Sequence, residues 1–199
     1  MSPQAGDTVQ VGNGYFSEGD FHVAAIGLGS NLGQSCAILQ AAWQDLQAHP
    51  DIFPQALSSP YRSQPIDMES AHWFVNAAAL FGTRLTPYSL LHLLQAIEAR
   101  YGRTRKPQVH GCQDRTLDLD LLLYDELVLH DHHLIIPHPR MERRLFVLAP
   151  LTEIAGDRSH PLSRKTMSAL CADLKKNVGN QIVEKLSWDK CLPCASMKK

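Results

Sequence analysis

Two aspartates separated by one residue are the side chains of this sequence best suited to hold a metal ion. Asp118 and Asp120 lie in "RTLDLDLLLYD", with leucines at the alternate positions 117, 119 and 121. A strand sends successive side chains to opposite faces, so the two carboxylates share one face. At about 6.6 Å apart, two like charges repel by roughly 2.5 kcal/mol at an effective dielectric of about 20. A divalent cation would remove this repulsion, whereas the solvated face of an edge strand is the competing interpretation.

Cations gather directly before this strand. Arg103, Arg105 and Lys106 lie in "GRTRKPQVHGCQD", whose glycines, proline and polar residues are typical of a loop, and Arg115 immediately precedes the strand. Taken singly, such cations are typical of a solvated turn. Next to paired acids they favour phosphoryl-type transfer, in which carboxylates hold a metal and arginines clamp phosphate oxygens.

Three other polar positions leave alternatives open. Glu98 falls in the last turn of an expected helix, where its position in the helix dipole is unfavourable. It either has a ligand or, as its position by itself favours, is a surface glutamate relieved by Arg100 or the cations that follow. His138 in "IPHPR" is placed either to donate to a phosphate or to finish a strand. The "HDHH" stretch at 130–133 suits a metal, although an exposed hairpin turn is the more typical interpretation.

Hydrophobic periodicity predicts the elements that position these residues. A short strand is expected from His22, breaking into the glycines and tight turn of 27–33. Further strands are expected at 56–63, 73–83, 116–125, 126–130 and 133–138, and helices at 34–49, 86–101, 141–156 and 163–176. Thr86 as N-cap and Pro87 in the first turn define the clearest helix, and Ser30 and Asn31 are expected to cap the first one. This order indicates an α+β sandwich with helices packed on a largely antiparallel sheet.

Length and charge limit the other possibilities. The chain has 199 residues, with 19 basic and 20 acidic side chains and a pI near 6.8, so bulk charge suggests neither a nucleic acid nor a membrane partner. We expect one domain at 22–180, a flexible leader at 1–21 and a polar tail at 181–199. Without an apolar run of about 18 residues or a signal segment, the sequence predicts a soluble, cytoplasmic protein.

The cysteines support the same location. Five of them stand at irregular spacing, which fits a reducing compartment better than a disulfide framework. The "CLPC" stretch at 191–194 has no second cysteine or histidine pair at matching spacing, so zinc binding is the weaker interpretation. We expect Cys191 and Cys194 to be two thiols in a solvated tail.

Several stretches in order resemble one enzyme family. "GLGSNLG", "NAAALFGT", "GRTRK", "RTLDLDLLLYD" and "IPHPRMERRLFVLAPLTEIAG" resemble the motifs of the 6-hydroxymethyl-7,8-dihydropterin pyrophosphokinases of folate biosynthesis, over about residues 22 to 157. The resemblance implies a ferredoxin-like α/β sandwich. It also implies transfer of the β,γ-pyrophosphoryl group of ATP to the pterin hydroxymethyl oxygen, with release of AMP. A pair of Mg²⁺ ions and ATP as co-substrate are expected with it. A monomer is a separate expectation, which the resemblance does not supply.

The resemblance also implies roles for individual residues. Asp118 and Asp120 would bind the metal ions and, with Arg103 and Arg115, form the catalytic set. The residues expected to contact ATP are Gln95, Glu98, Arg103, Arg105, Arg115, Leu121, His138 and Arg144. Those expected to contact the pterin are Gly29, Ser63, Gln64, Ile66, Phe74, Asn76 and Phe146. Aromatic rings and an amide suit a flat heterocycle with a hydrogen-bonding edge.

The loop before Arg115 departs from the family pattern. Many members have tryptophan, glycine and proline there, whereas this chain has "HGCQD", with His110 in place of the tryptophan. Two further hypotheses follow: a non-catalytic ATP- or pterin-binding homologue, and a different metal-dependent nucleotidyl transferase on the same fold. The retained acids and arginines argue against the first, and the match at Asn76 and Phe146 disfavours the second.

Overall fold

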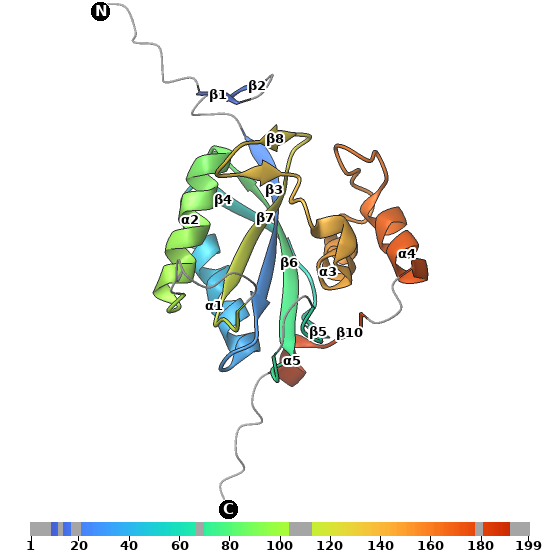
Figure 1. Cartoon of the computed structure of the whole chain (residues 1–199). Coiled ribbons are helices and arrows are strands. Elements are labelled where there is room, and N and C mark those ends of the chain that lie inside the picture. The colour runs from blue at the N-terminus through green and yellow to red at the C-terminus, as the bar shows by residue number, and fades with distance from the viewer. Residues whose placement is uncertain are drawn as a thin grey trace, which may run out of the picture.

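An antiparallel sheet forms the centre of the molecule. The computed structural model describes residues 9–11, 14–16, 21–66, 70–103, 113–177 and 181–191 (Figure 1). The main sheet has the order β10-β5-β6-β3-β7, β4 also pairs with β6, and every pairing within the described sheet is antiparallel. Its strands are β3 (His22–Ser30), β4 (Ile52–Leu57), β5 (Tyr61–Ser63), β6 (Phe74–Thr83), β7 (Asp118–Tyr124) and β10 (Val183–Lys185). The strand that carries the paired acids, β7, is therefore an edge strand.

Helices cover both faces of this sheet (Figure 1). On one face α1 (Ser35–Gln47) and α2 (Pro87–Arg100) bury a cluster that includes Leu39, Leu94 and Phe81. On the other face α3 (Leu145–Ala155) and α4 (Met167–Asn177) bury a second cluster that includes Leu148 and Met167. The expected α+β sandwich with a largely antiparallel sheet is confirmed.

Short elements complete the chain. A small hairpin of β8 (Leu129–His130) and β9 (Ile135–Ile136) follows β7, and the 3₁₀ helix η1 (Met141–Arg143) precedes α3. Within the expected leader, β1 (Val9–Val11) pairs with β2 (Gly14–Phe16). Among the residues that the structure describes, none of the helices combines the length and the hydrophobicity needed to cross a bilayer.

Strand β7 has the alternation that its sequence predicts. Leu117, Leu119 and Leu121 are buried in the cluster under α1 and α2. Asp118 and Asp120 therefore point to the opposite face, the one that α3 covers. Further along, Ala25 pairs with Leu123 but Ile26 pairs with Leu121, so one residue of β7 bulges there. The regular part of the strand, with a period of two, is the part that carries the acids.

The two long helices begin differently from each other. The Thr86 side chain accepts the Ser89 N–H at the start of α2, as the sequence predicts. Helix α1 instead begins after Gln34, whose side chain makes no capping hydrogen bond, so the prediction that Ser30 and Asn31 cap it is wrong. The Asn31 amide is engaged elsewhere, since its Oδ1 accepts the Arg115 N–H at 2.7 Å. The Asn31 side chain thus holds the backbone that leads into β7, rather than capping the start of α1.

The sheet continues past the boundary expected at residue 180. Strand β10 pairs with β5, and the following α5 (Trp188–Cys191) ends in a disulfide between Cys191 and Cys36 of α1. The expectations that the cysteines stay reduced and that Cys191 is a free thiol in a solvated tail are therefore wrong for this pair. Cys194 lies outside the described residues. The physical reason is that β5 would otherwise leave an edge of unpaired backbone groups, which β10 satisfies.

Reduction of this disulfide is expected to lower the melting temperature by roughly 5–15 °C, because the bond closes a long loop of the unfolded chain. Cys36 and Cys191 are separated by 155 residues. Thermal unfolding followed by circular dichroism with and without dithiothreitol measures the shift. The double variant Cys36→Ala/Cys191→Ala is the control, since the reductant should not change its melting temperature. Equal melting temperatures for oxidised and reduced wild type would contradict the expectation.

Candidate active site

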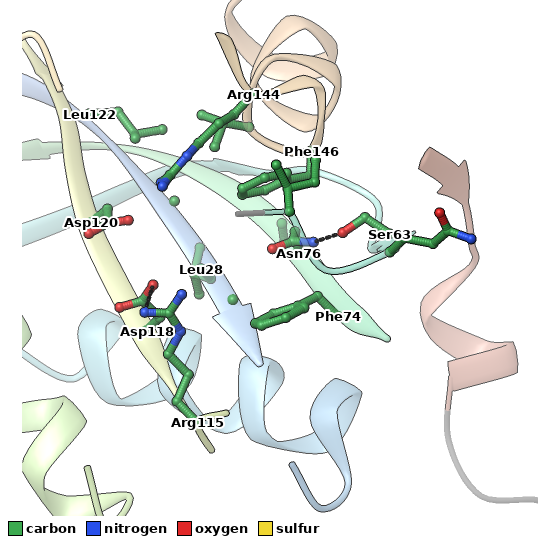
Figure 2. Close-up of a pocket in the computed structure, with 16 residues that line it drawn as sticks. Leu28, Ser63, Phe74, Asn76, Arg115, Asp118, Asp120, Leu122, Arg144 and Phe146 are labelled. Atoms are coloured by element: carbon green, nitrogen blue, oxygen red, sulfur yellow. Dashed lines mark hydrogen bonds and ion pairs between the residues drawn. The ribbon is translucent and has the colours of Figure 1, made fainter. Parts of the chain in front are cut away.

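A first cavity opens on the face of the sheet that α3 covers (Figure 2). Strands β3, β5 and β6 and the start of α3 supply its walls, and Figure 2 shows the rings of Phe74 and Phe146 facing the space around Asn76. Every residue expected to contact the pterin lines it: Gly29, Ser63, Gln64, Ile66, Phe74, Asn76 and Phe146. Folding thus brings together in one pocket residues that are far apart in sequence.

The floor of this cavity depends on Gly29. In the register of the sheet Gly29 lies opposite Asn76 on one side and opposite Asp118 on the other. A Cβ at this position would lie 3.2 Å from Asn76 Oδ1 and 3.8 Å from Asp118 Cβ. The missing side chain therefore leaves room between an amide and a carboxylate. Asn76 Nδ2 donates to Ser63 Oγ at 2.9 Å, which fixes the orientation of the amide.

A second cavity lies at the β7 edge, beside α2. It is lined by Leu91, Glu98, Arg103, residues 119–121, residues 131–135, His138 and Pro139. Among the expected ATP contacts, this cavity gathers Glu98, Arg103, Leu121 and His138. Arg115 and Arg144 line the first cavity instead, and Arg105 lies outside the described residues. Gln95 lies on α2 between Leu91 and Glu98 but does not line the second cavity.

Asp120 lines both cavities, so molecules bound in the two would meet at its carboxylate. Burial, together with the neighbouring charge of Asp118, raises the pKa of Asp120 to about 7. An oxygen-donor pair of this kind fits Mg²⁺, which uses one or two carboxylates together with water and phosphate oxygens. Within the described ranges, no group of three or more His, Cys, Asp or Glu side chains could hold a metal ion.

Asp118 lies between two guanidinium groups. Arg103 Nη1 contacts Asp118 Oδ1, and Arg115 Nη1 lies 3.0 Å from Asp118 Oδ2. Burial disfavours the charge on Arg103, but Asp118 and Glu98 outweigh this effect and raise its pKa. The Nε of Arg115 is buried with no hydrogen-bond partner among the described residues.

Glu98 is a buried residue rather than a surface one. It is 2% exposed, contacts Arg103, and accepts the Leu119 N–H at 2.8 Å. The expectation of a surface position is wrong, but the expected relief by a following cation is confirmed for Arg103, whereas Arg100 pairs with Asp45. Glu98 therefore joins the end of α2 to β7 and to the arginine that follows the helix.

Two cations lie over the aromatic rings of the first cavity. The Arg144 guanidinium lies 5.5 Å from the Phe146 ring centroid, and that of Arg115 lies 5.8 Å from the Phe74 ring centroid. His138 lies near Arg144, and burial followed by this positive charge lowers its pKa to about 4. His138 is consequently a neutral imidazole at physiological pH, able to donate from one nitrogen and accept at the other.

The "HDHH" stretch is the turn of a hairpin, as the more typical interpretation predicts. Asp131 Oδ1 accepts the N–H groups of His133 and Leu134 between β8 and β9. The same turn lines the second cavity through His132 and His133. The sequence does not indicate this location, because the position of the turn depends on how the hairpin lies beside α2.

Comparison with known proteins identifies relatives of the chain. A model of the family described as 7,8-dihydro-6-hydroxymethylpterin-pyrophosphokinase matches residues 25–156. A Methylorubrum extorquens protein named 2-amino-4-hydroxy-6-hydroxymethyldihydropteridine pyrophosphokinase is 41% identical over 134 residues, which are 67% of this chain and 83% of the relative. A Bacillus subtilis protein of the same name is 42% identical over 133 residues, with 67% and 78% covered.

Solved structures share the fold. The wild-type HPPK-DHPS of Plasmodium falciparum, crystallised with SDX-DHP, superposes with a TM-score of 0.62 at 13% identity. The match covers 81% of this chain and 46% of that longer one. The chain thus spans less than half of the HPPK-DHPS protein, and the likeness supports the architecture alone.

Proposed function

Because this chain belongs to the 7,8-dihydro-6-hydroxymethylpterin-pyrophosphokinase family, we propose that it transfers the pyrophosphoryl group of ATP to 6-hydroxymethyl-7,8-dihydropterin. The pterin hydroxymethyl oxygen attacks the β-phosphorus, the bond to the bridging α,β-oxygen breaks, and AMP leaves with that oxygen. The products are AMP and the pterin diphosphate of folate biosynthesis. The observation that carries this proposal is the meeting of two cavities at the Asp120 carboxylate.

One assay separates this function from its alternatives. The protein is incubated with ATP, Mg²⁺ and reduced hydroxymethylpterin, and the products are separated by chromatography. AMP together with pterin diphosphate supports the proposal. Tight binding of both ligands without turnover would instead indicate a non-catalytic homologue, and release of pyrophosphate would indicate a nucleotidyl transferase.

We assign the pterin to the first cavity. The floor around Gly29 accommodates a flat ring, the ring faces of Phe74 and Phe146 provide stacking, and the fixed amide of Asn76 provides donor and acceptor atoms. Ser63, Gln64 and Ile66 complete the pocket on the β5 side. Asp118 and Asp120 line the same cavity, so a pterin bound there lies beside the two carboxylates.

We assign ATP to the second cavity. Leu121 and the hairpin turn offer apolar and polar contacts at the β7 edge, and His138 offers an uncharged hydrogen-bonding ring. Glu98 lines this cavity from α2. Gln95 on the same helix and Arg105 are proposed as further contacts of ATP. Arg103, Arg115 and Arg144 converge on the boundary between the cavities, where the phosphates would lie.

Asp118 and Asp120 are the residues that would hold a pair of Mg²⁺ ions. When bound, these ions neutralise negative charge on the phosphate oxygens. The chain's own contribution is to orient the two carboxylates from one face of β7 and to surround them with arginines. Arg103 and Arg115 would then bind the oxygens of the transferred group as its charge redistributes.

We further propose that the protein acts in the cytoplasm, because its proposed substrates, ATP and a reduced pterin, are small intracellular molecules. We also propose that it acts as a monomer. Both cavities are lined by residues of one chain, so the site needs no second copy. Light scattering of the purified protein at working concentration tests the monomer, and a stable dimer would contradict it.

Phe146→Ala and Asn76→Ala are expected to weaken pterin binding roughly 10- to 100-fold and to leave nucleotide binding within about twofold. The first removes stacking area, and the second removes the amide that pairs with the pterin edge. Calorimetric titrations with the pterin and with a non-hydrolysable ATP analogue, performed separately, measure the selectivity.

Trp73→Ala is the matched control for these variants. Trp73 directly precedes Phe74 but stacks under Arg62, with the guanidinium 4.2 Å from the ring centroid, and does not line the first cavity. Its loss should leave both affinities unchanged. If Phe146→Ala and Asn76→Ala weakened the binding of both ligands equally, the assignment of the pterin to the first cavity would be wrong.

A further inference from the structure

Residues that follow the region matched by the family model contact both walls of the first cavity. The match ends at residue 156, and the segment 181–188 lies beyond it. We propose that Gln181 is a positioning residue for the pterin, because it fixes the backbone on both sides of Arg144 and so orients Arg144 and Phe146. This inference rests on the proposed function, since it assigns the pterin to the first cavity.

Gln181 makes two hydrogen bonds around one residue of the cavity wall. Its Oε1 accepts the Leu145 N–H at 2.7 Å, and its Nε2 donates to the Arg143 carbonyl oxygen at 2.9 Å. Arg143 and Leu145 flank Arg144, which lines the cavity together with Phe146. Gln181 thus holds the two backbone groups that set the direction of Arg144.

The start of α3 depends on this contact. Arg144 is the N-cap residue, and its own side chain makes no capping hydrogen bond. The first N–H groups of a helix have no acceptor within the helix and need one from elsewhere. Gln181, 36 residues further along the chain, supplies the acceptor for Leu145. Phe146 lies in this first turn, so the position of its ring depends on how the start of α3 is held.

The segment that contains Gln181 also contacts the opposite wall of the cavity, which β5 forms. Two residues after Gln181, Val183 of β10 lies opposite Ser63 of β5, and the pairing continues to Lys185 opposite Tyr61. Ser63 in turn fixes the Asn76 amide through its Oγ. The segment therefore connects the β5 wall to the α3 wall, which makes the distance between Ser63 and Phe146 depend on it.

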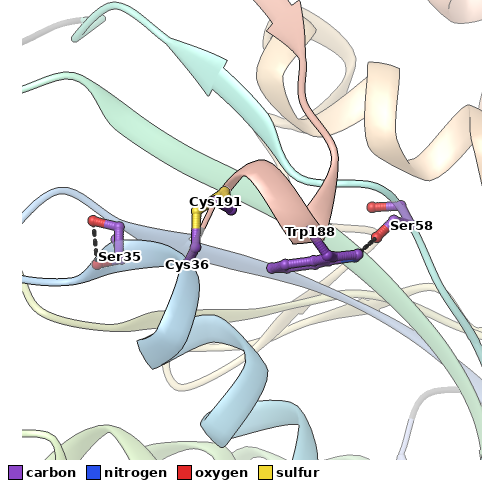
Figure 3. Close-up of a disulfide and its surroundings, with 6 residues drawn as sticks. Ser35, Cys36, Ser58, Trp188 and Cys191 are labelled. Carbon is purple, nitrogen blue, oxygen red and sulfur yellow. Dashed lines mark hydrogen bonds between the residues drawn. A yellow bond between two sulfur atoms is a disulfide. The ribbon is translucent and has the colours of Figure 1, made fainter. Parts of the chain in front are cut away.

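Further contacts anchor this segment to the body of the protein (Figure 3). Trp188 Nε1 donates to the Ser58 carbonyl oxygen at 3.0 Å, and Cys191 is joined to Cys36 of α1. On the α3 side, Glu153 accepts the Tyr61 hydroxyl at 2.9 Å and pairs with Lys185 at 3.2 Å. These contacts do not involve Gln181, so the segment stays attached when Gln181 is replaced.

This independence makes a selective test possible in the full-length protein. Gln181→Leu keeps the size of the side chain but removes both hydrogen bonds. Gln181→Glu keeps an acceptor for the Leu145 N–H, and its negative charge suits a helix N-terminus. Glu184→Gln, an exposed position on β10, is the control within the same segment.

Gln181→Leu is expected to raise the pterin Kd roughly tenfold and the Kd for a non-hydrolysable ATP analogue by no more than about threefold, because Arg144 is one of three arginines proposed to contact the phosphates. The KM for the pterin should rise more than kcat falls, Gln181→Glu should recover most of the pterin affinity, and Glu184→Gln should behave as wild type. A purely structural role would lower the melting temperature and affect both ligands alike.

Calorimetry, steady-state kinetics and thermal unfolding on the four proteins provide these readouts. Wild-type pterin affinity in Gln181→Leu, an equal loss for both ligands, or a Glu variant no better than the Leu variant would each overturn the role of Gln181. If the wild-type protein itself neither binds the pterin nor forms its diphosphate, the proposed function fails and this inference fails with it. Normal wild-type activity with an unaffected Gln181→Leu variant removes only the inference.

Discussion

Asp120→Asn is expected to lower turnover by at least about a thousandfold, because it removes an oxygen ligand and a charge from the proposed metal site. Without metal, the variant should be as stable as wild type or more so. Burial and the Asp118 charge raise the pKa of Asp120 to about 7, which means that its ionised form costs folding free energy. Rapid-quench assays at saturating Mg²⁺ measure turnover, and urea unfolding in a chelator measures stability.

Asp125→Asn is the matched control at the other end of the same strand. Asp125 directly follows β7, accepts the Val23 N–H at 2.8 Å and pairs with His22, and lines neither of the two large cavities. It should lose stability and keep its turnover when folded, which is the reverse of Asp120→Asn. If Asp120→Asn unfolds in the chelator, or retains near-normal turnover at ordinary Mg²⁺, the metal-site assignment is wrong.

Asp118→Ala should also lose turnover, but its stability is a poorer test. Asp118 is the carboxylate between Arg103 and Arg115, so its removal leaves two neighbouring guanidinium groups without their shared partner. That repulsion offsets the relief at Asp120. The contrast between the two acids arises from their arginine contacts and not from their sequence positions.

Arg103→Lys is expected to lower the rate of the chemical step by about 100- to 1000-fold while ATP affinity changes much less. Lysine keeps a positive charge beside the buried Glu98 but loses the planar fork that binds two phosphate oxygens at once. Alanine is less suitable, because it would leave Glu98, at 2% exposure, without its cation. Single-turnover quench-flow separates the chemical step from ATP dissociation.

Arg100→Lys provides the control for this substitution. Arg100 lies in the last turn of α2, the helix that Arg103 follows, its side chain is 59% exposed, and it pairs with Asp45 away from both cavities. Its rate and ATP affinity should equal those of wild type. An unchanged chemical step in Arg103→Lys, or a loss confined to ATP dissociation, would reduce Arg103 to a charge that only attracts the nucleotide.

Local patterns in the sequence determined the elements that carry the site. Alternating leucines and aspartates define β7 and its two faces, because side-chain direction in a strand depends only on the parity of the position. Thr86 and Pro87 define the start of α2 for a similar reason, since a helix cap involves atoms within one turn. Motif resemblance then predicted the residues of the first cavity, because the order of the motifs along the chain is itself characteristic.

Only the tertiary structure decided which residues became partners across the fold. Glu98 looked like a surface glutamate by its helix position, yet the Leu119 N–H and Arg103 enclose it. Asn31 is a residue type that often caps a helix, but its side-chain amide oxygen instead accepts the N–H of Arg115, just before β7. In each case the competing partner is distant in sequence, so no local preference could indicate it.

The C-terminal segment is the clearest example. Residues 181–191 read as a polar tail because they are short, charged and far from the motifs. Their place was determined by the free edge of β5, by the uncapped start of α3 and by Cys36 of α1. The sequence by itself thus determined β7, the long helices and the chemical character of the site. It did not determine that the strand expected at 56–63 is divided between β4 and β5, nor that β10 and α5 form in the expected tail. The tertiary structure decided what holds its walls together, because unpaired backbone groups are satisfied by whichever segment the fold brings within hydrogen-bonding distance.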